Sequence, residues 1–110
     1  MAQNPLDQMC DAIAGCETLA FLDLSTRMVL LKNSATPASQ DMLNAICAEA
    51  EQVLKSGAVG LVASRERMTI FLRSATMPSD ALCCVCAIGT DVEAVLSMGQ
   101  SCLAEIGGGA

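Results

Sequence analysis

Residues 58–89 read AVGLVAS-RE-RMTIFLRS-ATMPSD-ALCCVCAIG. Three strand-like runs, Ala58 to Ser64, Arg67 to Ser74 and Ala81 to Gly89, are separated by a two-residue turn and by a loop that contains Pro78. Connections this short join neighbouring antiparallel strands. The last run is almost wholly apolar, which is typical of a strand at the centre of a sheet. The stretch therefore predicts a three-stranded antiparallel meander.

A long helix precedes this meander. Ser39 is a favourable N-cap and Gly57 suits the position after a helix, so the helix is predicted to run to about Ser56. Its apolar residues fill an arc of about 140°, wider than the roughly 100° that covers one sheet. One flank is therefore predicted to meet the sheet and the other a second surface, and the pattern leaves open which flank does which. The two flanks are Met42, Ile46 and Val53, and Leu43, Cys47 and Leu54, with Ala50 between them.

Two strands and a short helix lie further upstream. The strands, Thr18 to Leu24 and Arg27 to Lys32, are apolar on both faces, which is typical of a sheet that is covered on both sides. Asn4 is predicted to cap the short helix and Gly15 to end it. The segment from Asn33 to Pro37 is predicted to be a loop.

The chain closes with another helix. Thr90 and Glu93 have the spacing of a capping box, with Thr90 as the cap. The apolar residues that follow predict a helix as far as Ile106. Residues 107–110 are predicted to be a flexible tail.

The composition predicts one domain that buries part of its surface against another chain. The 110 residues fit a single domain, 1–110. Hydrophobic residues make up 53% and charged residues 16%, against roughly 25% charged in a typical domain. No apolar run reaches the about 18 residues of a membrane span, and the N-terminus lacks the basic opening of a secretion signal. The apolar excess therefore predicts a dimer.

Cysteine content and charge indicate the compartment and exclude one class of partner. Seven cysteines are an odd number, which argues against a complete disulfide framework and favours a reducing cytoplasm. The net charge is −6, and the six Lys and Arg residues are scattered singly. Nucleic acid binding is disfavoured, because neutralising phosphates needs clustered cations.

The residues that usually perform catalysis are scarce. There is no His and no phosphate-binding glycine loop. Cys83, Cys84 and Cys86 form the densest thiol cluster, but a zinc site needs four converging ligands and a reactive thiol needs a base or cation nearby. On a strand these residues alternate between two faces, so they are interpreted as core. The sequence predicts no catalytic, cofactor-binding or metal-binding residue and no cofactor.

The charged side chains also have structural interpretations. Asp23 precedes a turn and is predicted to stabilise it. Arg65, Arg67 and Arg73 are expected to gather around one hairpin, as a solvated turn or, alternatively, as a contact for an acidic partner.

Methionines are frequent. They fit core packing and an adaptable recognition surface equally well. The residues concerned are Met28, Met42, Met68, Met77 and Met98.

All these runs together predict an α+β domain, a five-stranded antiparallel sheet with helices on both faces, in the order helix–strand–strand–helix–strand–strand–strand–helix. This order resembles the roadblock family, the dynein light chain and bacterial GTPase-regulator domain, whose fold is profilin-like. Ile13-Ala14-Gly15 followed by Leu19 to Asp23 is similar to the family's opening. The first hairpin turn, Leu24 to Arg27, departs from the family because it lacks the frequent glycine. The longin fold and small sensor domains are the nearest alternatives.

The resemblance implies a non-enzymatic cytoplasmic scaffold or regulator that acts on or with a small Ras-like GTPase or a larger protein assembly. Such domains form homodimers or heterodimers, in which the edge strand 58–64 would pair with its own copy beside helix 39–56. That strand has no charge and no Pro, so as an exposed edge it would invite aggregation. The residues expected at the interface are Met42, Leu43, Ile46, Ala50, Val53, Val59, Leu61 and Ala63.

A small-ligand sensor of profilin-like or PAS-like shape is the alternative function. Such a sensor needs a pocket with convergent polar groups, and the strands offer almost none.

Overall fold

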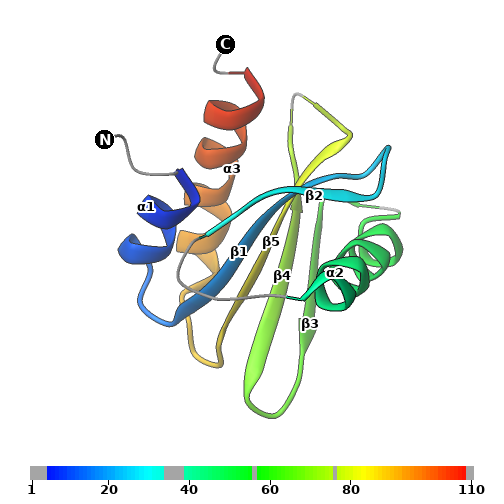
Figure 1. Cartoon of the computed structure of the whole chain (residues 1–110). Helices are drawn as coiled ribbons and strands as arrows, with labels where there is room; N and C mark the ends of the chain where they lie inside the picture. The colour runs from blue at the N-terminus through cyan, green and yellow to red at the C-terminus, as the bar shows by residue number, and fades with distance from the viewer. Residues whose placement is uncertain (1–4, 34–38, 56, 76, 109–110) are drawn as a thin grey trace.

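A computed structural model of the chain describes residues 5–33, 39–55, 57–75 and 77–108. Five strands form one antiparallel sheet in the order β2-β1-β5-β4-β3. Helices α1 and α3 cover one face of the sheet and α2 lies on the other (Figure 1). The elements are α1 (Pro5–Ala12), β1 (Cys16–Asp23), β2 (Met28–Lys32), α2 (Gln40–Val53), β3 (Val59–Ala63), β4 (Arg67–Arg73), β5 (Asp80–Ala87) and α3 (Val92–Gly108). The predicted fold class and element order are confirmed.

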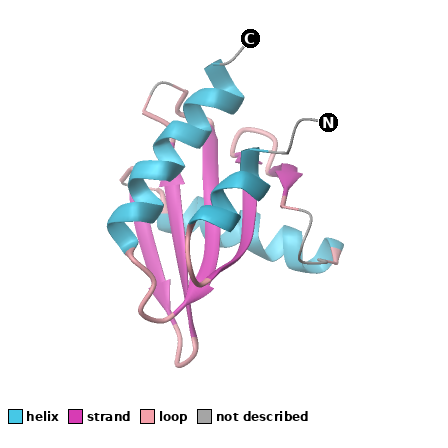
Figure 2. Ribbon diagram, turned by 90° about the vertical axis from the view of Figure 1, so that its left-hand side faces the viewer, coloured by secondary structure: helices cyan, strands magenta, loops and turns pink. Residues whose placement is uncertain are grey.

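The sheet separates two apolar cores. Figure 2 shows α1 and α3 side by side in front of the strands, with α2 behind them. Successive residues of β1, β4 and β5 enter opposite cores, which is why these strands are apolar on both faces. The core under α1 and α3 includes Leu6, Met9, Leu19, Phe21, Ile70, Leu82, Cys84, Val95 and Leu103. The core under α2 includes Ala20, Leu22, Ile46, Cys47, Ala50, Leu54, Phe71 and Cys83.

The central position of β5 is also confirmed. It pairs with β1 on one side and with β4 on the other. Five of its residues are buried, and they divide between the two cores. A strand with neighbours on both sides and helices on both faces meets little water, which is the physical reason for its apolar sequence.

The start of α2 is as predicted and its end is not. The N-cap is Ser39, whose Oγ accepts a hydrogen bond from Met42 N at 3.2 Å. The helix stops at Val53 rather than near Ser56, which itself lies outside the described residues. Arg73 Nη2 donates to the carbonyl oxygen of Leu54 at 2.7 Å, so a cation from β4 holds the C-terminal end of the helix.

The start of α3 corrects the predicted capping box. Ala94 N donates to Asp91 Oδ1 at 3.3 Å, so Asp91 is the capping residue. The Thr90 hydroxyl instead donates to the carbonyl oxygen of Ala87 at 2.7 Å.

Both chain ends differ in part from the predicted boundaries. The helix α3 includes Gly107 and Gly108, which the sequence had assigned to the tail. Asn4, the predicted cap of α1, and the last two residues lie outside the described residues. No helix in the described part of the chain is long and apolar enough to cross a membrane.

The turn between β1 and β2 has no glycine, and a non-glycine residue takes the left-handed conformation there. Arg27 has a φ of 58°, in the left-handed region that favours glycine. Asp23 Oδ1 accepts hydrogen bonds from Ser25 N at 2.9 Å and from Ser25 Oγ at 2.6 Å. These bonds from Ser25 lower the pKa of Asp23. The predicted turn-stabilising role of Asp23 is confirmed.

Candidate functional site: the edge of β3 and the groove between two helices

The strand β3 is an edge of the sheet. In the part of the chain that the structure describes, it pairs with β4 alone. Its apolar side chains stay accessible: Val59 is 49% exposed, Leu61 47% and Val62 37%. The expectation that the strand after the long helix is a sheet edge is therefore confirmed.

The outward backbone groups of β3 follow from its register. Ser64 N donates to the carbonyl oxygen of Arg67, and Arg73 N donates to that of Ala58. Backbone groups that point toward the same neighbour recur at every second residue of an antiparallel ladder. The N–H and C=O groups of the odd-numbered residues 59, 61 and 63 therefore point away from β4. The edge offers both apolar side chains and a free hydrogen-bonding ladder.

The residues expected at an interface lie at three depths. Met42, Val59, Leu61 and Ala63 are exposed, and Leu43 and Val53 are half-buried. Ile46 and Ala50 are buried between α2 and the sheet, together with Cys47 and Leu54. The sheet therefore takes the Leu43, Cys47 and Leu54 flank together with Ile46 and Val53 of the other flank, so the predicted division into a sheet flank and a partner flank is wrong. Of the six residues in the two flanks, Met42 alone is exposed.

The other sheet edge, β2, is built differently. Phe21 pairs with Leu31 and Leu22 pairs with Val29, so Leu30 is an extra residue that forms a β-bulge. Leu30 is 52% exposed, which is close to the exposure of Leu61. A bulge twists an edge away from regular pairing. By contrast, all five residues of β3 keep a regular register with β4.

The three arginines expected around one hairpin do not gather there. Arg67 lies at the β3–β4 turn, and its Nε is 2.9 Å from Glu17 Oε1. Arg73 lies at the opposite end of β4, where it binds the end of α2. The expectation was wrong because Arg67 and Arg73 lie at opposite ends of β4.

The thiols are distributed as their alternation predicted, with one contact that the sequence did not reveal. Cys83 enters the core under α2, whereas Cys84 and Cys86 enter the core under α1 and α3. Within the described ranges, no group of three or more His, Cys, Asp or Glu side chains could hold a metal ion. The unforeseen contact joins Cys16 and Cys84, whose Sγ atoms are 3.8 Å apart. No local pattern signals this pair, because 68 positions separate its members.

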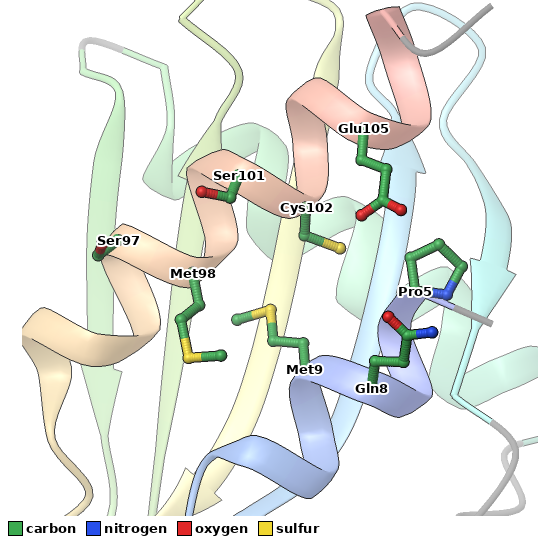
Figure 3. A pocket seen from close by; sticks show the side chains of 8 residues that line it. All are labelled: Pro5, Gln8, Met9, Ser97, Met98, Ser101, Cys102 and Glu105. Carbon is green, nitrogen blue, oxygen red and sulfur yellow. The ribbon is translucent and has the colours of Figure 1, made fainter. Parts of the chain in front are cut away.

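A groove of about 300 Å³ lies between α1 and α3 (Figure 3). Met9, Met98 and Cys102 supply its apolar part. Gln8, Ser101 and Glu105 supply polar groups along it, as Figure 3 shows. These residues lie on α1 and α3, so the lack of polar groups in the strands gave no indication of this groove.

Comparison with known proteins identifies the fold. No protein-family model and no curated protein sequence matches the chain. The structure is similar to the crystal structure of a roadblock/LC7 domain from Streptomyces avermitilis, with a TM-score of 0.72 and 8% identity over 97% of both chains. It is also similar to the crystal structure of MglC from Myxococcus xanthus, with a TM-score of 0.68 and 8% identity over 96% of both chains. The chain therefore has the roadblock fold along nearly its whole length.

Proposed function

We propose that this chain is a non-enzymatic regulatory and scaffolding domain of the roadblock family. In this proposal it forms a homodimer and acts on or with a small Ras-like GTPase or a larger protein assembly in the cytoplasm. The fold supports the class of protein, and the free edge of β3 supports the dimer.

The observation that carries the dimer is the contrast between the two sheet edges. A regular, uncharged edge strand is a template for pairing with another chain. The edge at β2 has a bulge and is bounded by Arg27 and Lys32, whereas β3 has neither a bulge nor a charge. Antiparallel pairing of β3 with its own copy would satisfy the outward groups of residues 59, 61 and 63, and would extend one sheet across both protomers.

Such pairing also brings the accessible side of α2 toward its copy. Val53 packs over Gly60 of β3, and Met42, on the same flank of α2, is 37% exposed. Because the arrangement is two-fold, each substitution at the interface acts twice.

The test is the oligomeric state of the wild-type chain and of two edge variants, measured by light scattering after size exclusion. Leu61→Asp places a charge on the proposed interface, and Leu61→Pro removes an outward N–H without touching the ladder to β4. Both variants are expected to be monomeric. Leu30→Asp is the matched control, since Leu30 is similarly exposed on the bulged edge, and it should remain dimeric. Ile46 is a poor test position, because a charge in that core would unfold the monomer.

A wild-type chain that stays monomeric at high micromolar concentration would contradict the dimer. So would Leu61→Asp and Leu61→Pro variants that remain dimeric while circular dichroism shows native folding. The GTPase part has its own test, which is titration of purified Ras-like GTPases from the same organism, in both nucleotide states, into the dimer. The expected result is that at least one GTPase binds in a way that depends on its bound nucleotide. If none of the GTPases binds, the proposed regulatory role is contradicted, whereas the proposed scaffolding role is not affected.

The groove between α1 and α3 supports a second function, a small-ligand sensor. Its volume of about 300 Å³ is at the lower end of the range of small-molecule sites, and it combines methionines with polar side chains. A metabolite that raises the melting temperature of the wild-type chain but not that of a Met98→Trp variant would favour the sensor.

A further inference from the structure

The contact between Cys16 and Cys84 joins two thiols of very different exposure. Cys16 begins β1 and is half-buried, whereas Cys84 in the middle of β5 is 1% exposed. Their Sγ atoms are 3.8 Å apart, which is van der Waals contact between sulfur atoms. A partly exposed thiol poised beside a second, buried thiol resembles the pair of oxidised and resolving cysteines in redox sensors.

We propose that Cys16 is an oxidation site for hydroperoxides and that Cys84 is its resolving thiol, so that oxidation joins the two strands through a reversible disulfide. Hydroperoxide is the chemical class of the co-reactant. The site lies outside the proposed dimer interface, because β5 and β4 separate β1 from β3.

The neighbours of Cys16 favour its thiolate, which is the reactive form. The hydrogen bond from the Cys84 thiol lowers the pKa of Cys16 to about 7, and the same interaction raises the pKa of Cys84. Burial raises the pKa of the neighbouring Cys10 to about 12, and its thiol donates to the Cys16 carbonyl oxygen at 3.4 Å. Partial burial and, more weakly, the Glu17 carboxylate oppose ionisation of Cys16, and the hydrogen bond with Cys84 outweighs them. Cys16 is therefore the thiol of this group that attacks the hydroperoxide. Cys84 stays protonated until it forms the disulfide.

The local backbone gives Cys16 room to close the remaining distance. A disulfide needs its sulfur atoms at about 2.05 Å. Cys16 lies at a register irregularity of β1, directly after Gly15, and both features are where a strand end bends readily. Cys86 is the cross-strand partner of Cys16, but its thiol donates to the Met68 carbonyl oxygen at 3.7 Å and so points toward β4. Cys84 is therefore the better placed partner.

The chemistry has two balanced steps. The Cys16 thiolate attacks the terminal oxygen of the hydroperoxide and the O–O bond breaks, which gives a sulfenic acid on Cys16. The leaving group is hydroxide from hydrogen peroxide or alkoxide from an organic hydroperoxide, and protonation turns it into water or an alcohol. The Cys84 sulfur then attacks the Cys16 sulfur, the S–S bond forms, and the sulfenic oxygen leaves as water with the Cys84 proton. Two thiols lose two electrons in total, and the peroxide gains them. A small dithiol reverses the reaction by exchange.

The experiment treats the reduced full chain with hydrogen peroxide and then counts thiols after denaturation. The wild-type chain should lose two of its seven thiols and regain them with dithiothreitol. Cys16→Ser should lose none under the same exposure. Cys84→Ala should stop at the sulfenic acid, which dimedone traps on Cys16 and mass spectrometry locates. Alanine is used at position 84 because a serine hydroxyl would be buried there without a partner.

Matched controls separate this pair from the other thiols. Cys47→Ala removes a buried thiol of the core under α2, and Cys102→Ala removes a buried thiol of α3. Both variants should still lose two thiols. Trypsin cleaves after Arg27 and Arg73, so the expected disulfide links peptide 1–27 to peptide 74–110, and a Cys10→Ser variant should keep that link. The proposal is overturned if Cys16→Ser is oxidised as fast as the wild-type chain. It is also overturned if the link survives in Cys84→Ala, or if dimedone labels a different cysteine.

Discussion

Val53 of α2 lies directly over Gly60 of β3, so closely that a Cβ built on Gly60 would overlap Val53 Cγ1. This contact brings the helix close to the edge strand, because Gly60 has no Cβ to hold Val53 away. The glycine inside this otherwise apolar strand, VGLVA, is explained by this approach of the helix.

Gly60→Ala should therefore destabilise the chain. Overpacking of this kind costs about 1–3 kcal/mol, and urea unfolding should show a lower midpoint with an unchanged slope. Gly57→Ala is the control, since its added Cβ would meet nothing closer than the Val59 carbonyl oxygen at 3.8 Å. Adding Val53→Ala to Gly60→Ala should recover part of the loss. Strictly additive effects in this double-mutant cycle would contradict the contact.

Asn33→Ala should also be costly, although the sequence places Asn33 at the start of a loop. The side chain is fully buried, its Oδ1 accepts from Leu19 N at 3.0 Å and its Nδ2 donates to the Glu17 carbonyl oxygen at 3.2 Å. Truncation leaves these buried groups unsatisfied, at a cost of about 1–3 kcal/mol. Thermal unfolding measures the loss, and Asn44→Ala on the exposed face of α2 should change the free energy of unfolding much less. Equal effects of the two substitutions would count against the role of Asn33.

Asp91→Ala should destabilise α3 by about 1 kcal/mol, because it removes the acceptor for Ala94 N. Asp91→Asn keeps an acceptor and should lose less. Glu93→Ala distinguishes the observed cap from the capping box that the sequence predicts. Glu93→Ala should change the free energy of unfolding in urea only slightly. A loss of stability as large as that of Asp91→Ala would support the capping box of Thr90 and Glu93 instead.

Because folding changes the pKa values of several thiols, the free energy of unfolding should depend on pH between about 7 and 11. Burial raises the pKa of Cys102 to about 11 and that of Cys10 to about 12, above the ordinary value of 9.0. The native state therefore keeps protons that the unfolded state loses, so the free energy of unfolding should fall as the pH rises through 9 toward 11. Cys16 acts with the opposite sign. Its pKa of about 7 gives stability that is present above pH 9 and is lost as the pH falls through 7.

Urea unfolding in excess reductant, measured across this range, checks both signs. Cys102→Ala should flatten the fall above pH 9, and Cys16→Ser should flatten the rise between pH 7 and 9. A wild-type curve that is level from neutral pH to pH 11 would show that none of Cys10, Cys16 and Cys102 changes its pKa on folding.

Much of the architecture could be predicted from local patterns. Strand alternation, the Ser39 cap and the Asp23 turn depend on residues that are close in the chain, and all three are as predicted. The central place of β5 was also predictable, because burial on both faces leaves an almost continuous apolar run. Element ends depend on distant residues as well, since Arg73 of β4 binds the Leu54 carbonyl oxygen at the end of α2.

The sequence by itself determined the element order and the sheet with apolar residues on both faces. Only the tertiary structure decided which edge is regular and which is bulged, and that residues of both flanks of α2 meet the sheet. It also decided that α1 and α3 enclose a groove and that Cys16 touches Cys84. The physical reason is range. Periodicity and capping arise from forces between near neighbours in the chain, whereas an edge, a groove and a thiol pair exist only where distant segments pack together.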